Sequence, residues 1–128
     1  MNTTGNSNRD LREQVSFSQK YVIWLLRILL PPYVHNEEAA DFLRTEIGQN
    51  DGAIEWVAVR PDGLSDESEV TEYAVHPSPI RSTIFDAGLT SRMNVGDFMA
   101  ELITDDDTWN ASKGKMPVIY NKEAKSAE

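Results

Sequence analysis

The feature that most constrains this fold is an apolar run that ends abruptly in a charged turn. Residues 54–60, "IEWVAVR", lead directly into the turn-forming "PDG", and a second apolar run, "MPVIYN", covers 116–121. Neither run alternates polar and apolar residues, which is typical of parallel strands buried on both faces. We therefore expect an α/β fold. Because two parallel strands do not form a core alone, we also expect the chain to be part of a larger sheet.

Two helices are expected before the first strand. The first covers about 10–30 and ends at the proline pair that starts at Pro31, since proline cannot continue a helix. The second covers 37–47, with Asn36 as its N-cap and Gly48 at its C-terminal end.

A third helix is expected between the two strands, capped by Asn94 and ending by Thr104. Its expected buried stripe consists of Val95, Phe98, Met99, Leu102 and Ile103. The acidic segment 62–72 has the composition of a solvated loop, and 73–92 of short extended pieces broken by proline and glycine.

Composition excludes several classes of function. The chain has 128 residues, a formal net charge of −9 and no cysteine. It has no Lys/Arg cluster, and a phosphate backbone would be repelled, so nucleic acid is not expected as a partner. The most apolar stretch, 21–30, is about half as long as a membrane span. Acidic residues precede it and prolines follow it, unlike a secretory signal. We expect no transmembrane segment and a cytoplasmic location.

The order of these motifs resembles a known family. A helix of the type "NEEAADFLRTEIG" is followed by "EWVAVRPDGL", then by "TSRMNVGDFMAELI" and "MPVIYN". This series resembles the C-terminal half of the atypical short-chain dehydrogenase/reductases, NAD(P)-binding Rossmann proteins with NmrA-like and flavin-reductase-like members. There a W-T-x-x-R-P strand precedes an R-x-D-V-A-x-F-M helix, which Arg92 to Met99 match with Asn94-Val95-Gly96 in place of Asp-Val-Ala.

The resemblance implies the C-terminal part of a doubly wound, parallel Rossmann-like sheet over residues 1–121, with a polar tail at 122–128. It implies an oxidoreductase-type protein whose intact relatives transfer hydride from NAD(P)H. It places Met1 near the end of the family's fifth strand, so the sheet is expected to be incomplete and the protein truncated.

The sequence contains no G-x-G-x-x-G or G-x-x-G-x-x-G motif. Such a loop lets backbone amides approach a pyrophosphate closely. NAD(P) is therefore implied as the cofactor by resemblance, but we expect this chain alone not to bind it tightly.

The resemblance also suggests site residues. Tyr33 is the candidate catalytic tyrosine, but Glu37 stands four places later, where the family's active members carry lysine. An acid raises a tyrosine pKa rather than lowering it, so we expect the isolated chain to be inactive by the family mechanism. The residues expected on the substrate and cofactor side are Thr3, Thr4, Arg60, Pro61 and Arg92.

Each of these residues has a structural alternative. Arg60 could bind a ligand phosphate or carboxylate, or pair with Asp62 or Glu55. Arg92 could likewise bind the ligand, or it could pair with an acid near the third helix. The two threonines could position a substrate carbonyl, or belong to a frayed terminus. The two histidines lack paired spacing, so no metal site is expected.

A second hypothesis comes from another functional class. The apolar helix around 21–30 and an open sheet edge would suit a non-catalytic interaction module. Such a module would cover these surfaces with its own copy, as a homo-oligomer, or with a complementary Rossmann half.

Overall fold

The computed structural model describes residues 17–29, 31–82 and 87–122. The elements are α1 (Phe17–Leu29), α2 (Pro31–Phe42), a π-helical turn η2 (Leu43–Ile47), β1 (Arg60–Pro61), β2 (Gly63–Ser65), β3 (Tyr73–His76), β4 (Leu89–Ser91), α3 (Arg92–Thr104), α4 (Asp106–Ser112) and β5 (Val118–Asn121). The expected α/β class is confirmed.

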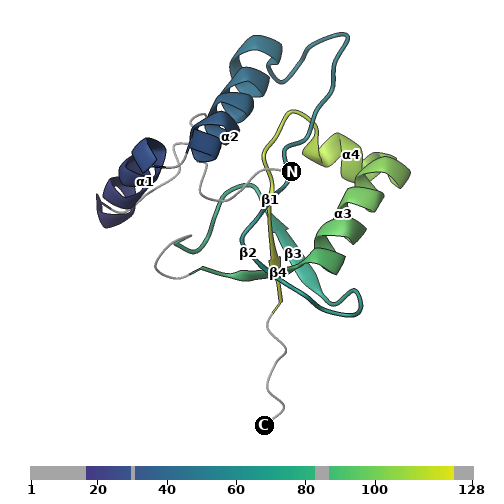
Figure 1. Cartoon of the computed structure of the whole chain (residues 1–128). Helices are drawn as coiled ribbons and strands as arrows, with labels where there is room; N and C mark the ends of the chain where they lie inside the picture. Colours follow the sequence, from purple (N-terminus) through teal and green to yellow (C-terminus); the bar gives the residue numbers. More distant parts are fainter. Residues whose placement is uncertain (1–16, 30, 83–86, 123–128) are drawn as a thin grey trace.

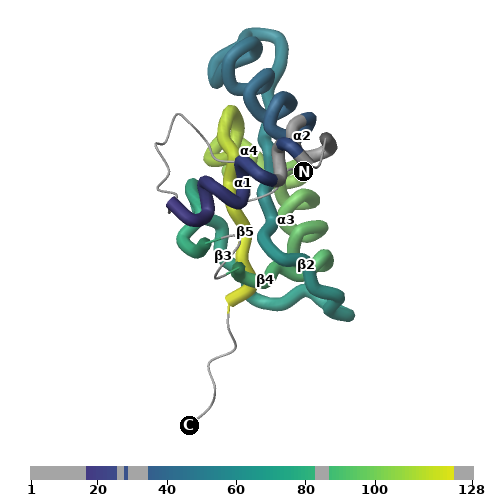
Figure 2. Tube along the Cα trace, turned by 60° about the vertical axis from the view of Figure 1, so that its left-hand side comes forward, coloured from purple at the N-terminus to yellow at the C-terminus, as the bar shows by residue number. Residues whose placement is uncertain are grey.

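The larger sheet has the order β1-β5-β3. β1 runs parallel to β5, with Arg60 opposite Val118. The pairing extends backward through hydrogen bonds from the Ala58 amide to the Lys115 carbonyl (3.1 Å) and from the Arg60 amide to the Pro117 carbonyl (2.8 Å). Parallel pairing of the two apolar segments is therefore present, but the expected strand 54–60 is wrong in its extent. Val57 forms an isolated bridge with Lys115, and the ladder itself consists of Arg60 and Pro61, where a turn was expected. β3 pairs antiparallel to β5, so this sheet is mixed, and Figure 2 shows β5 between the β3 segment and the segment carrying β1 and β2.

Helices cover both faces of the parallel pair. Successive residues of the extended run point to opposite sides, so an apolar run makes both faces apolar, and each face packs against a helix. Trp56 and Ala58 pack with Met116 and with Ala40 of α2. On the other face Val59 packs with a cluster formed mainly by α3, whose members are Val95, Phe98, Leu102 and, from β5, Ile119. Figure 1 shows α1 and α2 on one side of the strands and α3 and α4 on the other.

A second parallel pair begins where β1 ends. β2 pairs with β4, with Gly63 opposite Leu89 and Ser65 opposite Ser91. The prediction that 62–72 is entirely a solvated loop is therefore wrong at its start. These three-residue strands carry polar residues, and no periodicity in the sequence indicates them.

Two helix boundaries also differ from prediction. α2 begins at Pro31, because proline is tolerated in the first turn, where its missing N–H has no intrahelical partner. Asn36 therefore lies inside a helix and does not cap one. The expected end at Gly48 is confirmed, with φ +73° and its amide bonded to the Leu43 carbonyl.

The N-terminus of α3 lies one turn earlier than expected. Ser91 is its N-cap and accepts a hydrogen bond from the Asn94 amide, while Asn94 itself is fully buried. The helix ends at Thr104 as predicted, and Asp105 then caps α4 through the Thr108 amide. Two members of the expected buried stripe are wrong, because Met99 and Ile103 are exposed.

The predicted absence of a transmembrane helix holds for the residues described here. None of their helices has the length and apolar character needed to cross a bilayer.

Candidate functional site at the carboxyl ends of β1 and β5

The charged tetrapeptide after the first apolar run forms a buried structural junction. Arg60 is fully buried, and its Nε donates to the Met116 carbonyl at 2.8 Å while Nη2 lies 3.4 Å from the Pro77 carbonyl. Pro61 is also buried and pairs with Ile119 across the parallel ladder. These contacts explain how a charged residue can be buried directly after the apolar run, since the guanidinium satisfies carbonyls that burial removes from water.

Asp62 continues the junction. Its carboxylate accepts hydrogen bonds from the amides of Gly63 (3.0 Å) and Gly88 (2.9 Å). It thereby links the start of β2 to the segment that enters β4. Gly88 has no room for a side chain, because an added Cβ would lie 2.5 Å from the Tyr120 ring. The sequence offered Asp62 only as a possible partner of Arg60, with the "DG" turn as its signal, and contained no signal for the role of Gly88.

A buried amide network lies behind the junction, at the start of α3. The Asn94 Nδ2 donates to Asn121 Oδ1 (2.8 Å) and to Thr71 Oγ1 (2.9 Å), and its Oδ1 accepts from the Thr71 amide (2.8 Å). Asn121 Oδ1 also accepts from the Ser91 amide. Because both polar atoms of the Asn94 side chain have partners, this cluster holds segments together and presents no reactive group.

A cavity of about 330 Å³ opens beside the carboxyl end of β5. It is lined by Arg81, Ala87, Gly88, Leu89, Tyr120, Asn121 and Lys122. Within the described residues the almost fully buried Tyr120 hydroxyl has no hydrogen bond of good geometry. Burial raises its pKa, while the nearby amides of Ile80 and Arg81 act in the opposite direction. Arg81 and Lys122 bring two cations to the cavity, which suits a small polar or anionic group, whereas the Tyr120 hydroxyl itself is buried.

The second cavity is larger and more apolar. It measures about 460 Å³ and lies between β3, α3 and α4, with Tyr73 and Phe98 in its wall. The Tyr73 hydroxyl donates to Asp97 Oδ2 at 2.9 Å. Burial and this acidic partner raise the tyrosine pKa, so Tyr73 stays protonated at neutral pH and is no general base.

Of the predicted site residues whose side chains the structure describes, Arg60 and Pro61 lie together and Arg92 lies apart from them. Arg60 and Pro61 are adjacent at the end of β1 and line neither of these two cavities. Arg92 is exposed at the start of α3 and pairs with Asp66, one of the alternatives the sequence left open. Tyr33 is on α2, but its side chain lies outside the description, as do Thr3 and Thr4 entirely.

Within the described residues, the site has neither a recognisable metal-binding group nor a counterpart among known proteins. Among the described residues no group of three or more histidine and acidic side chains could hold a metal ion. No protein-family model matches this chain, and neither a curated protein nor a solved structure matches it.

Proposed function

We propose that this chain is the C-terminal, ligand-side part of an NAD(P)-binding Rossmann-like protein of the oxidoreductase type, related to the atypical short-chain dehydrogenase/reductases. The observation that carries the proposal is the parallel β1–β5 pair with α2 packed on one face and α3 on the other. Ligands of open α/β sheets bind at the carboxyl ends of such strands.

The position of the polar features supports this proposal. The Arg60–Asp62 junction and the cavity beside Tyr120 both lie at the carboxyl ends of β1 and β5. Arg81 and Lys122 are among the residues that line that cavity; Lys122 also lies 3.6 Å from Glu72, and Arg81 has another interaction within the chain. A phosphate or carboxylate group of a ligand would be attracted there.

The proposal assigns dinucleotide phosphate binding to a different segment or chain, because no Gly-rich loop of the required spacing is present. Within the described residues, β1 pairs on one side only, with β5. A further parallel strand would add on the opposite side of β1. Tyr33 has no lysine four residues later, so we also assign the acid/base group of hydride transfer to a different segment or chain.

Isothermal titration of NADPH and NADH tests the proposal. The titrations use the purified chain and the complex recovered from its native cells through a tag on the C-terminal tail. We expect the complex to bind with a Kd between about 1 μM and 1 mM and the chain alone at least about 100-fold more weakly. A complex that binds neither dinucleotide contradicts the proposal, and so does tight binding by the chain alone.

Two lysines near opposite ends of β5 provide a matched pair of variants. Lys122 lines the cavity beside Tyr120, whereas Lys115 lies before the strand and donates to the Ala111 carbonyl. If the cavity holds an anionic group of the ligand, Lys122→Gln weakens binding to the complex by about threefold or more. Lys115→Gln should leave the affinity unchanged.

A non-catalytic interaction module is the second candidate. The observation that favours it is the exposure of large apolar side chains along α1, among them Phe17, Tyr21 and Ile28. Such a surface is uncommon on a monomer and typical of a binding face.

A further inference from the structure

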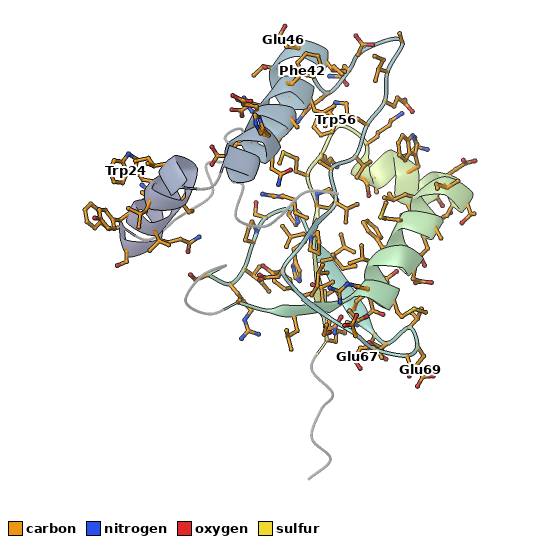
Figure 3. All side chains as sticks on the ribbon, in the orientation of Figure 1. Trp24, Phe42, Glu46, Trp56, Glu67 and Glu69 are labelled. Carbon is orange, nitrogen blue, oxygen red and sulfur yellow. The ribbon has the colours of Figure 1, made fainter. Side chains whose placement is uncertain are left out.

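One side of α1 carries an uncovered apolar stripe. Its members are Phe17, Tyr21, Trp24 and Ile28, which are 88%, 61%, 54% and 60% exposed. Their spacing of four, three and four residues places them on one face of the helix, as in the seam between two packed helices. Figure 3 shows Trp24 on the side of α1 that faces away from the sheet.

The stripe is not the face by which α1 joins the rest of the molecule. That face carries Gln19, which is buried and whose Oε1 accepts a hydrogen bond from Ser82 Oγ at 2.7 Å. α1 also packs against α2, the next helix in the chain. The contacts among residues 17–29, 31–82 and 87–122 therefore leave the stripe available to a partner.

The stripe is large enough to contribute to a specific interface. An aromatic side chain buries about 150–250 Å² in a core. The exposed fractions of Phe17, Tyr21 and Trp24 therefore correspond to roughly 400 Å². That is about half of the ~800 Å² that each partner contributes to a standard interface. The remainder has to come from a neighbouring element, and α2 exposes Phe42 beside its acidic residues.

Charge indicates which partner fits. α1 contains two bases, Lys20 and Arg27, and no acid, whereas α2 contains Glu37, Glu38 and Asp41 and neither lysine nor arginine. Asp41 already pairs with Arg44 of η2 and Glu38 lies 3.4 Å from His35, but the helix keeps an excess of negative charge. Pairing α1 with another α1 would bring like charges together, and pairing α1 with α2 would bring opposite charges together. The net charge of −9 disfavours an anionic membrane surface.

We propose that a second copy of this chain covers the stripe, with α1 of each copy packed against α2 of the other. This arrangement is self-complementary about a two-fold axis, as symmetric dimers require. The helices would contact through ridges spaced three and four residues apart. The proposal is independent of the dinucleotide proposal, since α1 contributes nothing to the cavity at the end of β5.

Sedimentation equilibrium of the purified full chain tests this arrangement. We expect a monomer–dimer equilibrium, and Trp24→Gln should raise the dimer Kd by about 30-fold or more, because buried tryptophans are frequent hot spots. Ile28→Gln is a second stripe variant in case the first fails to fold. Ile103→Gln is the matched control, since Ile103 is 86% exposed on α3, away from the stripe. It should change the Kd less than twofold.

A charge exchange identifies the contacting helices. Lys20→Glu should weaken the dimer about two- to fivefold, and Lys20→Glu combined with Glu38→Lys should restore it. Failure of that rescue contradicts the α1–α2 pairing. A chain that stays monomeric at all concentrations overturns the proposal, as does a dimer unaffected by either stripe variant. A monomer that binds vesicles of anionic lipid through Trp24 overturns it in favour of a membrane surface.

Discussion

Replacing Arg60 with methionine separates its two possible roles, and we expect the change to destabilise the fold. The guanidinium is buried, with hydrogen bonds of 2.8 Å to Met116 and 3.4 Å to Pro77. A hydrogen bond from a charged group contributes about 1.5–3 kcal/mol, and a long one contributes less. Because methionine avoids the desolvation cost of the guanidinium and fills much of its volume, we expect a net loss of about 2 kcal/mol.

Urea unfolding followed by tryptophan fluorescence measures this loss as a change in the free energy of unfolding. In thermal unfolding of a chain of this size, the same loss of about 2 kcal/mol lowers Tm by roughly 6–8 °C. Arg92→Met is the matched control, because Arg92 is exposed and its pair with Asp66 should contribute less than about 1 kcal/mol. Equal unfolding midpoints for the two variants would contradict a stabilising role of the buried Arg60 guanidinium. Unchanged stability of Arg60→Met, together with weaker NADPH binding by the complex, would restore the ligand-binding interpretation.

Further predictions concern the junction glycine and an ion pair. Gly88→Ala should lower the free energy of unfolding by about 1–3 kcal/mol, because the added Cβ would overlap the Tyr120 ring. Gly96→Ala, which meets nothing within 4 Å in a helix, should gain about 0.5–1 kcal/mol; thermal unfolding measures both. Hydrogen bonds from Lys113 and a neighbouring indole hold the pKa of Glu55 below its ordinary value of 4.5. The stabilisation that ionised Glu55 contributes to the fold is therefore fully present above pH 4.5 and is lost as the pH falls through the lowered pKa. Glu55→Gln should flatten the acid limb of Tm against pH, whereas Glu67→Gln, in the exposed acidic loop, should not.

The elements with strong apolar patterns could be predicted from the sequence. That the two apolar runs lie parallel followed from their lack of polar alternation, although the paired residues are fewer than the predicted strands. Gly48 marked a helix end. These features depend on local backbone chemistry and on side chains that must be buried wherever the chain folds. The sequence also left a structural role for Arg60 among the alternatives, but it placed the end of the strand at Arg60, whereas Pro61 belongs to β1.

The polar core of the junction could not be predicted. Asp62 and Asn94 are buried only because their partners, Gly88, Thr71 and Asn121, reach them from more than twenty residues away. No local pattern encodes such a partner, and an acid in a turn is usually solvated. The exposure of Ile103 also depends on distant parts of the chain. Helical spacing places it beside the buried residues of α3, but no described element covers it.

We propose above that this chain supplies the ligand edge of an NAD(P)-binding sheet. The most direct test is native mass spectrometry of the complex isolated from its own cells, followed by acid release and identification of any bound nucleotide. We predict a partner that contributes the Gly-rich phosphate loop and about one NAD or NADP per complex. An intact complex without any dinucleotide, or a stripe-dependent homodimer as the sole species, would contradict the claim.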